Sequence, residues 1–222
     1  MGKDVDSKNS ISFRVYDYGN KIDITWSGAI PIEQFLESEQ IIKSKLCSNI
    51  IHKKSETKIK AIEKLKMSFD PISNTEIEVL ILGSIPGDKS IGDQEYYAHP
   101  RNRFWRIISS ITANELPKDY KSKIELLLKN KIGVWDVAHT ANRKGSLDIN
   151  IKDEMPNDLE SLIYKSKKLK IIAFNGSKSA KMFNKYFIKK ADIKYILLPS
   201  SSPANASKSF EQICRVWQQL TQ

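Results

Sequence analysis

Cysteine is scarce in this sequence, with only Cys47 and Cys214 among 222 residues. The two cysteines lie far apart and neither has CxxC or Cys/His spacing around it, so neither a disulfide framework nor a zinc site is indicated. Clusters of His, Asp and Glu with metal-ligand spacing are missing, as is any cofactor fingerprint. We therefore expect a fold without disulfide bonds and a function that needs no metal and no cofactor.

Long hydrophobic runs are also absent. No apolar run approaches the ~20 residues that would span a bilayer, and the segment that begins at Met1 lacks the apolar core of a signal peptide. The sequence therefore predicts a cytoplasmic protein without a membrane segment. A chain of 222 residues can hold one large domain, or a domain with an appendage, and can bury a substantial core.

Acidic residues are outnumbered by basic ones, with 26 Asp and Glu against 36 Lys and Arg and a net charge of +10. Most of the excess follows residue 74, where 24 basic residues face 16 acidic ones. A basic surface attracts nucleic acid and supplies phosphate contacts, but it carries no sequence information. A lysine-rich surface that serves only solubility is the alternative, and it explains the clustered Arg101, Arg103 and Arg106 less well.

Residues 1–74 have an organisation of their own. Alternating apolar and polar residues at 11–16 and 22–26 flank a turn, which predicts a β-hairpin. Helical spacing follows at 31–46 and again at 56–67. A hairpin with two helices is marginal alone, and no chemical motif appears in this segment. We interpret it as a small α+β extension that packs on the main domain and serves as an accessory or protein-binding element.

From residue 75 onward, short apolar runs that predict buried strands alternate with segments of helical spacing. Strands are expected at 78–82, 132–137, 169–176 and 193–199, and helices at 103–111, 120–129, 156–165, 178–187 and 207–220. Such alternation implies a doubly wound α/β fold with a parallel sheet and right-handed crossovers. The loops at 83–105, 175–178 and 199–205 would then gather at one edge of the sheet, with 138–148 nearby.

The most particular stretch follows the first of these strands. Gly83, Pro86 and Gly87 leave little side-chain bulk in the turn GSIPG, so backbone N–H groups there can approach a ligand closely. An ordinary loop would explain this turn alone, because short Gly/Pro patterns recur by chance. The segment YYAHPRNRFW at 96–105 favours a binding site, since Ser, Asp and Gly would dominate a solvated loop.

Six motifs occur in the order GSIPG, YYAHPRNRFW, VWDV, GSLD, FNG and LPSSSPAN. Together they closely resemble the hypoxanthine-type branch of the uracil-DNA glycosylase superfamily, also called DNA-deoxyinosine glycosylase, over about residues 76–222. The resemblance implies a flavodoxin-like three-layer α/β/α sandwich with a four-stranded parallel sheet, in a catalytic domain at 75–222. It also implies a monomeric, monofunctional DNA glycosylase that hydrolyses the N-glycosidic bond of deaminated bases, hypoxanthine or uracil or both, in base-excision repair.

The resemblance further implies roles for individual residues. Asn102 takes the catalytic role, assisted by backbone donors from Ser84 to Gly87. Tyr97 falls where relatives place the ring that stacks on the extruded base. Asn175 would read the base edge, although a turn asparagine explains this residue equally well. The remaining expected base contacts are Ile85 and Phe104, and the expected DNA contacts are Arg101, Arg103, Lys178, Ser200, Ser201 and Ser202.

The chemistry of base removal is consistent with these residues. The reaction passes through an oxocarbenium-like sugar while negative charge grows on the base. Two flanking carboxylates, as in sugar hydrolases, are not evident. Asn102 can orient a water through its carbonyl or donate to the base through its amide, but it cannot be a strong general base. We therefore expect the reaction to depend on substrate electrostatics and backbone donors.

Two positions depart from other superfamily members. Ile85 stands where many carry an Asp or Asn that positions water, a departure that the hypoxanthine-type branch shares. Leu198 replaces a His or Asn that hydrogen-bonds to the leaving base. A catalytically weak or inactive DNA-binding module on the same fold is therefore the alternative, and a small-molecule enzyme is a weaker one. Asn102 favours an active enzyme, since a binding module needs no amide beside its pocket.

Three other polar residues lie within these motifs. His99 precedes a proline, and we expect it to be neutral, hydrogen-bonded and structural. Asp136 and Asp148 are candidate polar contacts, although a buried capping carboxylate is the more frequent explanation for each. No bulky wedge residue appears in the loop at 200–205, so the sequence does not identify the group that fills the emptied DNA helix.

Overall fold

The computed structural model describes residues 12–17, 22–27 and 65–221. The chain divides into two units, Met1–Ile59 and Lys60–Gln222. In the first unit, β1 (Ser12–Asp17) and β2 (Ile22–Ser27) pair antiparallel in continuous register. This pairing confirms the two predicted strands of the hairpin. The helix predicted at 31–46 and most of the one at 56–67 lie outside the described residues.

A four-stranded parallel sheet with the order β5-β4-β8-β9 forms the centre of the second unit. Its strands are β4 (Val79–Gly83), β5 (Ile132–Asp136), β8 (Ile171–Asn175) and β9 (Lys194–Leu198). Every residue of β4 is buried because both faces are covered: Val79 and Ile81 belong to one core cluster, and Leu80 and Leu82 to the other. The structure confirms the predicted doubly wound sheet.

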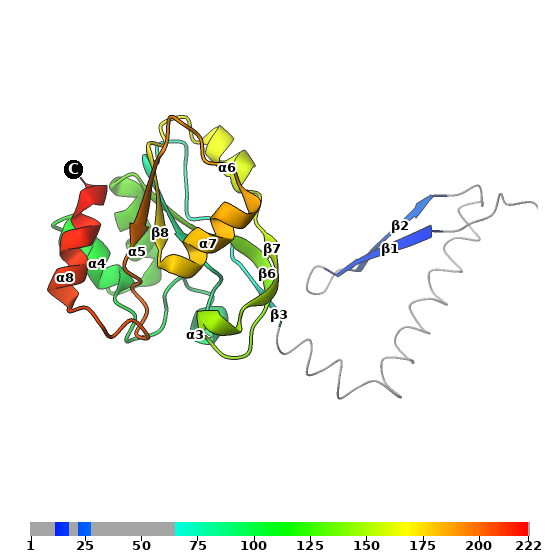
Figure 1. The fold of residues 1–222 in the computed structure, drawn as a ribbon, viewed down its shortest axis with the longest axis horizontal. Coiled ribbons are helices and arrows are strands. Elements are labelled where there is room, and N and C mark those ends of the chain that lie inside the picture. Colours follow the sequence, from blue (N-terminus) through cyan, green and yellow to red (C-terminus); the bar gives the residue numbers. More distant parts are fainter. Residues whose placement is uncertain (1–11, 18–21, 28–64, 222) are drawn as a thin grey trace, which may run out of the picture. The chain divides into compact units, whose positions relative to one another are not determined.

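Helices cover both faces of this sheet (Figure 1). On one face lie α4 (Phe104–Ile111), α5 (Tyr120–Lys129) and α8 (Phe210–Trp217), and on the other lie α6 (Leu159–Lys165) and α7 (Ser177–Tyr186). A short 3-10 helix, η2 (Gln218–Leu220), extends α8. The three layers form the flavodoxin-like α/β/α sandwich that the resemblance implied, and none of the described helices is long and apolar enough to cross a membrane.

A second, antiparallel sheet of order β3-β6-β7 was not predicted. Its strands are β3 (Leu65–Met67), β6 (Ala138–Asn142) and β7 (Lys152–Pro156). The predicted helix at 56–67 is wrong at its end, because residues 65–67 pair with β6 and bury Lys66. Two short helices, α3 (Asp88–Asp93) and η1 (Asp148–Asn150), also lie in segments that we expected to be loops.

The residues that follow β3 also contact the two sheets of the second unit. Ser68 N donates to His139 O at 2.7 Å, and Ile72 forms an antiparallel bridge with Val134 of β5. Residues 65–72, which the sequence assigned to the extension, are therefore structurally part of the second unit. The functional division into an accessory segment at 1–74 and a catalytic domain at 75–222 stays a prediction.

Candidate active site

A cleft of about 1110 Å³ opens at the carboxyl ends of the parallel strands, where open α/β sheets usually bind ligands. Gly83, Asp136, Asn175 and Leu198 each end one strand and line it. The rest of the lining comes from Val216 and from residues in the segments 84–90, 96–102, 143–148, 176–178 and 197–208. The loops therefore gather at one edge of the sheet, as predicted, and enclose enough space for a nucleobase and its sugar.

The turn GSIPG presents its backbone to this cleft. The carbonyls of Gly83 and Ser84 accept from Val137 N and Ala138 N at 2.9 and 3.0 Å, which fixes the turn to the junction of β5 and β6. No described residue accepts a hydrogen bond from the N–H groups of Ser84, Ile85 or Gly87. Such preorganised donors suit a developing negative charge. Ile85 lines the cleft as an apolar wall that is 5% exposed.

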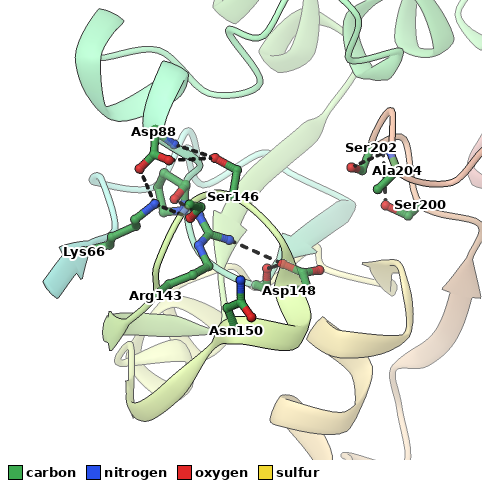
Figure 2. A network of polar contacts seen from close by, with 12 residues as sticks. Lys66, Asp88, Arg143, Ser146, Asp148, Asn150, Ser200, Ser202 and Ala204 are labelled. Atoms are coloured by element: carbon green, nitrogen blue, oxygen red, sulfur yellow. Dashed lines mark hydrogen bonds and ion pairs between the residues drawn. The ribbon is translucent and has the colours of Figure 1, made fainter. Parts of the chain in front are cut away.

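Arg143 holds this turn against the loop that follows β6 (Figure 2). The arginine is only 2% exposed, donates through Nη2 to Pro86 O and contacts Asp148 Oδ1 through Nη1 at 3.4 Å. Ser84 Oγ donates to the same carboxylate oxygen at 2.8 Å. Asp148 thus joins the two loops, and no motif in the sequence indicated that Arg143 would be buried here.

Lys66 of β3 makes a second connection between the same loops, as Figure 2 shows. Its amine is buried, pairs with Asp88 and donates to Gly145 O at 2.5 Å. Asp88 N in turn donates to Ser146 Oγ at 3.0 Å. The hydrogen bond from Lys66 lowers the pKa of Asp88, so this carboxylate stays charged. The network keeps the backbone of the turn in one position.

Asn102 lines the cleft with a fixed amide orientation. Its Oδ1 accepts from Phe104 N at 3.0 Å, and a backbone N–H can only donate, so the carbonyl end of the side chain is identified. No described residue accepts from Nδ2 of Asn102. The amide N–H groups of Asn102 are therefore available to a ligand in the cleft, while its carbonyl already accepts one hydrogen bond. His99 accepts from Arg101 N through Nδ1 at 3.1 Å, consistent with its expected structural role.

Tyr97 lines the cleft with a ring that is supported from behind. Its ring stacks on Phe104 with 3.9 Å between centroids and 14° between planes. Phe104 is fully buried and does not line the cleft, which corrects the expectation that it contacts the base. Tyr97 has φ of 56°, an unfavourable value for an aromatic residue, so the surrounding structure imposes this orientation.

Asn175 and Ser201 bind each other through two hydrogen bonds. Asn175 Nδ2 donates to Ser201 Oγ at 2.9 Å, and Ser201 N donates to Asn175 Oδ1 at 2.8 Å. Ser201 is fully buried, so its expected contact with DNA is wrong. Asn175 still lines the cleft, but both ends of its side-chain amide are hydrogen-bonded to the loop that follows β9. Reading of the base edge by Asn175 stays a prediction.

Arg103 also serves that loop rather than DNA. Its guanidinium donates to the backbone carbonyls of Lys208 at 3.1 Å, Ser202 at 3.2 Å and Asn205 at 2.7 Å. Its own N–H donates to Ser201 O at 3.1 Å. The guanidinium donates its hydrogen bonds to carbonyls of this loop, which corrects the expectation that it contacts a phosphate.

The other expected DNA contacts lie at the mouth of the cleft. Arg101 is exposed, and Lys178 is half-buried in the first turn of α7; both line the cleft. Ser200 Oγ accepts from Ser202 N at 3.2 Å, and Ser202 Oγ accepts from Ala204 N at 3.3 Å, as Figure 2 shows. Each hydroxyl therefore keeps its hydrogen to donate to a phosphate.

Metal ligation finds no support in the described part of the chain. Within these residues no group of three or more His, Cys, Asp and Glu side chains could hold a metal ion. The carboxylates at the cleft instead accept hydrogen bonds from protein groups, such as Ser84 Oγ on Asp148 and Ser68 Oγ on Asp136.

Comparison with known proteins agrees with this geometry. Residues 71–221 match the model of the uracil DNA glycosylase superfamily. A relative named hypoxanthine DNA glycosylase from Methanosarcina barkeri is 44% identical over 115 residues, which make up 51% of this chain and 73% of the relative. Another relative of that name, from Methanosarcina acetivorans, is 39% identical over 142 residues, which make up 64% of this chain and 89% of the relative.

A solved structure shares the fold as well. The solution NMR structure of a candidate uracil DNA glycosylase from Methanosarcina acetivorans matches 71% of this chain and 96% of its own, with 34% identity and a TM-score of 0.61. These comparisons confirm the resemblance that the six motifs indicated. The chain belongs to the uracil DNA glycosylase superfamily.

Proposed function

We propose that the protein is a monofunctional DNA glycosylase that removes deaminated bases, with hypoxanthine as its principal substrate, by hydrolysis of the N-glycosidic bond. Family membership and two relatives named hypoxanthine DNA glycosylase support the proposal. The observation that carries it is the amide of Asn102, whose carbonyl is held by Phe104 N while its N–H groups remain for a ligand in the cleft. An inactive binding module would have no need for that arrangement.

The proposed mechanism is dissociative. The target nucleotide leaves the DNA stack, and its base enters the cleft and lies against Tyr97, whose ring is backed by Phe104. As the bond between C1′ and the base lengthens, negative charge grows on the base. Asn102 and the backbone N–H groups of Ser84, Ile85 and Gly87 stabilise that charge, and a water adds to the sugar at C1′.

Phosphate contacts come from the mouth of the cleft. Arg101, Lys178 and the hydroxyls of Ser200 and Ser202 would hold the DNA backbone on either side of the extruded nucleotide. We propose that the enzyme acts as a monomer, because described residues of one chain supply every protein group that the mechanism uses. The cytoplasmic location expected from the sequence is kept in this proposal. The predicted accessory or protein-binding role of the segment at 1–74 is kept only for the residues that precede Leu65, because Lys66 and Ser68 contact residues in or beside the cleft.

The experiment is a substrate panel. Oligonucleotides with one deoxyinosine, deoxyuridine or deoxyxanthosine, in single-stranded and duplex form, are incubated with the protein and then treated with alkali, which cleaves the strand at abasic sites. We expect cleavage at deoxyinosine, and only after alkali. Cleavage at none of the three bases would overturn the proposal, and strand breaks without alkali would show that the enzyme is not monofunctional.

A further inference from the structure

One carboxyl group that lines the cleft has no role in the proposed reaction. Asp136 ends β5, is 4% exposed and lines the cleft. Ser68 Oγ donates to its Oδ2 at 3.1 Å, whereas no described residue donates to its Oδ1. A Cβ on Gly83 would lie 2.3 Å from that Oδ1, so the glycine allows the carboxyl to reach the end of the neighbouring strand.

No described residue forms an ion pair with Asp136. Arg143 is the nearby cation, but its guanidinium is bound to Pro86 O and Asp148. The hydroxyl of Tyr97 lies over the same glycine, is buried and has no hydrogen-bond partner among the described residues. Burial and the charge of Asp136 raise the pKa of Tyr97, so this phenol keeps its proton.

Burial favours the neutral form of Asp136. It raises the pKa of the carboxyl to about 7, against the lowering effects of Ser68, Arg143 and Tyr96, while Asp148 adds a further upward effect. Near neutral pH a large fraction of Asp136 therefore carries a proton beside the cleft. A carboxylic acid in that state can act as a general acid, as it can when its pKa lies near the operating pH.

A proton from this carboxyl would improve the leaving base beyond what hydrogen bonds achieve. A purine leaves more readily as a neutral base than as an anion, and Asn102 can donate a hydrogen bond but has no proton to transfer. Leu198, at the end of β9, is buried and apolar. Asp148 serves as an acceptor for Ser84 and Arg143. Among the groups that line the cleft, Asp136 has a carboxyl oxygen that accepts no hydrogen bond from a described residue, and its burial favours the protonated carboxyl.

We infer that Asp136 is the general acid that protonates the leaving purine, an inference that rests on the proposed excision of hypoxanthine. As the glycosidic bond breaks, its electron pair goes to the purine, and the carboxyl proton of Asp136 moves to an acceptor atom of the same base. Water adds to C1′, loses one proton to solvent and leaves a hydroxyl on the sugar. Solvent then reprotonates Asp136, so one water is consumed and a neutral base is released.

The test is the pH dependence of hypoxanthine release from a deoxyinosine duplex between pH 5.5 and 8, under single-turnover conditions with saturating enzyme. We expect the wild-type rate to fall as the pH rises through about 7. Asp136→Asn should be roughly a hundredfold slower at pH 6, because a general acid contributes at least that factor, and its rate should no longer fall with pH. Asp119→Asn, the same change at the N-cap of α5 and away from the cleft, should keep the wild-type profile.

The outcomes separate the inference from the proposed function. A wild-type protein that releases no hypoxanthine at any pH contradicts the proposed function itself. Release by the wild type together with an Asp136→Asn rate within a few-fold, and the same fall with pH, overturns only the role of Asp136. Should the variant not fold, the wild-type profile decides, because a rate that is flat or rises from pH 6 to 8 excludes a neutral carboxyl as the acid.

Discussion

Asn102 carries the central catalytic assignment, and its hydrogen bond to Phe104 N allows its two ends to be tested separately. Asn102→Ala removes the whole amide and should lower base release by at least roughly a hundredfold, the usual loss for one donor to a developing charge. DNA binding should stay within a few-fold, because Asn102 serves the transition state. Single-turnover rates and titration of labelled duplex measure the two effects.

Asn102→Asp is the sharper variant. It keeps an acceptor for Phe104 N and loses both amide N–H donors, so helix α4 should begin as before. We expect it to be as inactive as Asn102→Ala. Retained activity in the aspartate variant would show instead that the side-chain oxygen of Asn102 orients the attacking water.

Tyr97 is expected to act through its ring. Aromatic stacking is worth ~1–3 kcal/mol per base, so Tyr97→Ala should slow base release roughly ten- to a hundredfold, whereas Tyr97→Phe should stay close to wild type. The alanine defect should be smaller on single-stranded substrate, because extrusion costs less there. If phenylalanine is as damaging as alanine, the buried hydroxyl is the working group and the stacking role is wrong.

Asp136 should leave a signature in protein stability as well. Folding raises the pKa of Asp136 from 3.8 to about 7, so the folded state binds this proton more tightly than the unfolded chain does. The resulting contribution to the unfolding free energy is complete below about pH 4 and is lost as the pH rises through 7. Asp136→Asn should therefore gain stability relative to wild type by roughly 3–4 kcal/mol between pH 4 and pH 8. Urea unfolding at several pH values measures this difference, and a difference that does not change with pH would show that the carboxyl is charged in the native protein.

Residue types alone did not separate side chains that face the ligand from those that build the site. Arg101 and Arg103 stand two positions apart in one motif, yet the first is exposed at the cleft and the second donates to the carbonyls of a distant loop. Phe104 follows Tyr97 in the same motif and lies behind its ring. Their roles depend on the direction of each side chain, which the sequence pattern does not contain.

At the scale of elements, the loop after β9 is held by Arg103 and the bridge between Asn175 and Ser201. Arg103→Ala leaves several backbone carbonyls without a donor, so we expect it to lower the unfolding free energy by roughly 2–4 kcal/mol. Its effect on the salt dependence of DNA binding should be small. Thermal melts and binding titrations at several salt concentrations measure both quantities.

Arg101→Ala is the matched variant. Arg101 is exposed and has no hydrogen-bond acceptor for its guanidinium among the described residues. Its loss should leave the melting temperature unchanged and reduce the slope of log K against log salt by about 1, the value for one phosphate contact. The reverse pattern, with Arg101→Ala unstable and Arg103→Ala altered in salt dependence, would contradict the division of roles between the two arginines.

Elements built from local periodicity were predictable, and those built from distant pairing were not. The buried strands and amphipathic helices such as α4 and α5 follow from apolar spacing within one segment. β3 is three residues long and pairs with β6, about 75 positions further along the chain, so helical spacing in its own sequence was misleading. The same long-range pairing places Lys66 in the network beside the active site, where no local motif indicated it.

At the scale of the whole molecule, the chain combines a basic surface with a cleft that has no candidate metal site among its described residues. We therefore expect base release to be independent of divalent cations. Dialysis against EDTA should leave the single-turnover rate within about twofold, since metal loss normally abolishes the activity of a metal-dependent hydrolase. A loss of activity that Mg²⁺ or Zn²⁺ restores would contradict this expectation.

The identity of the released product is the most direct test of a DNA glycosylase activity. A duplex with a single deoxyinosine is incubated with excess protein, and the small molecules are separated from the DNA and identified by mass spectrometry. We predict free hypoxanthine and abasic sites in equal amounts, with the wild-type yield approaching the amount of substrate and the Asn102→Asp yield near background. Intact deoxyinosine after prolonged incubation, or release of the nucleoside in place of the base, would contradict the assignment of this cleft as a DNA glycosylase active site.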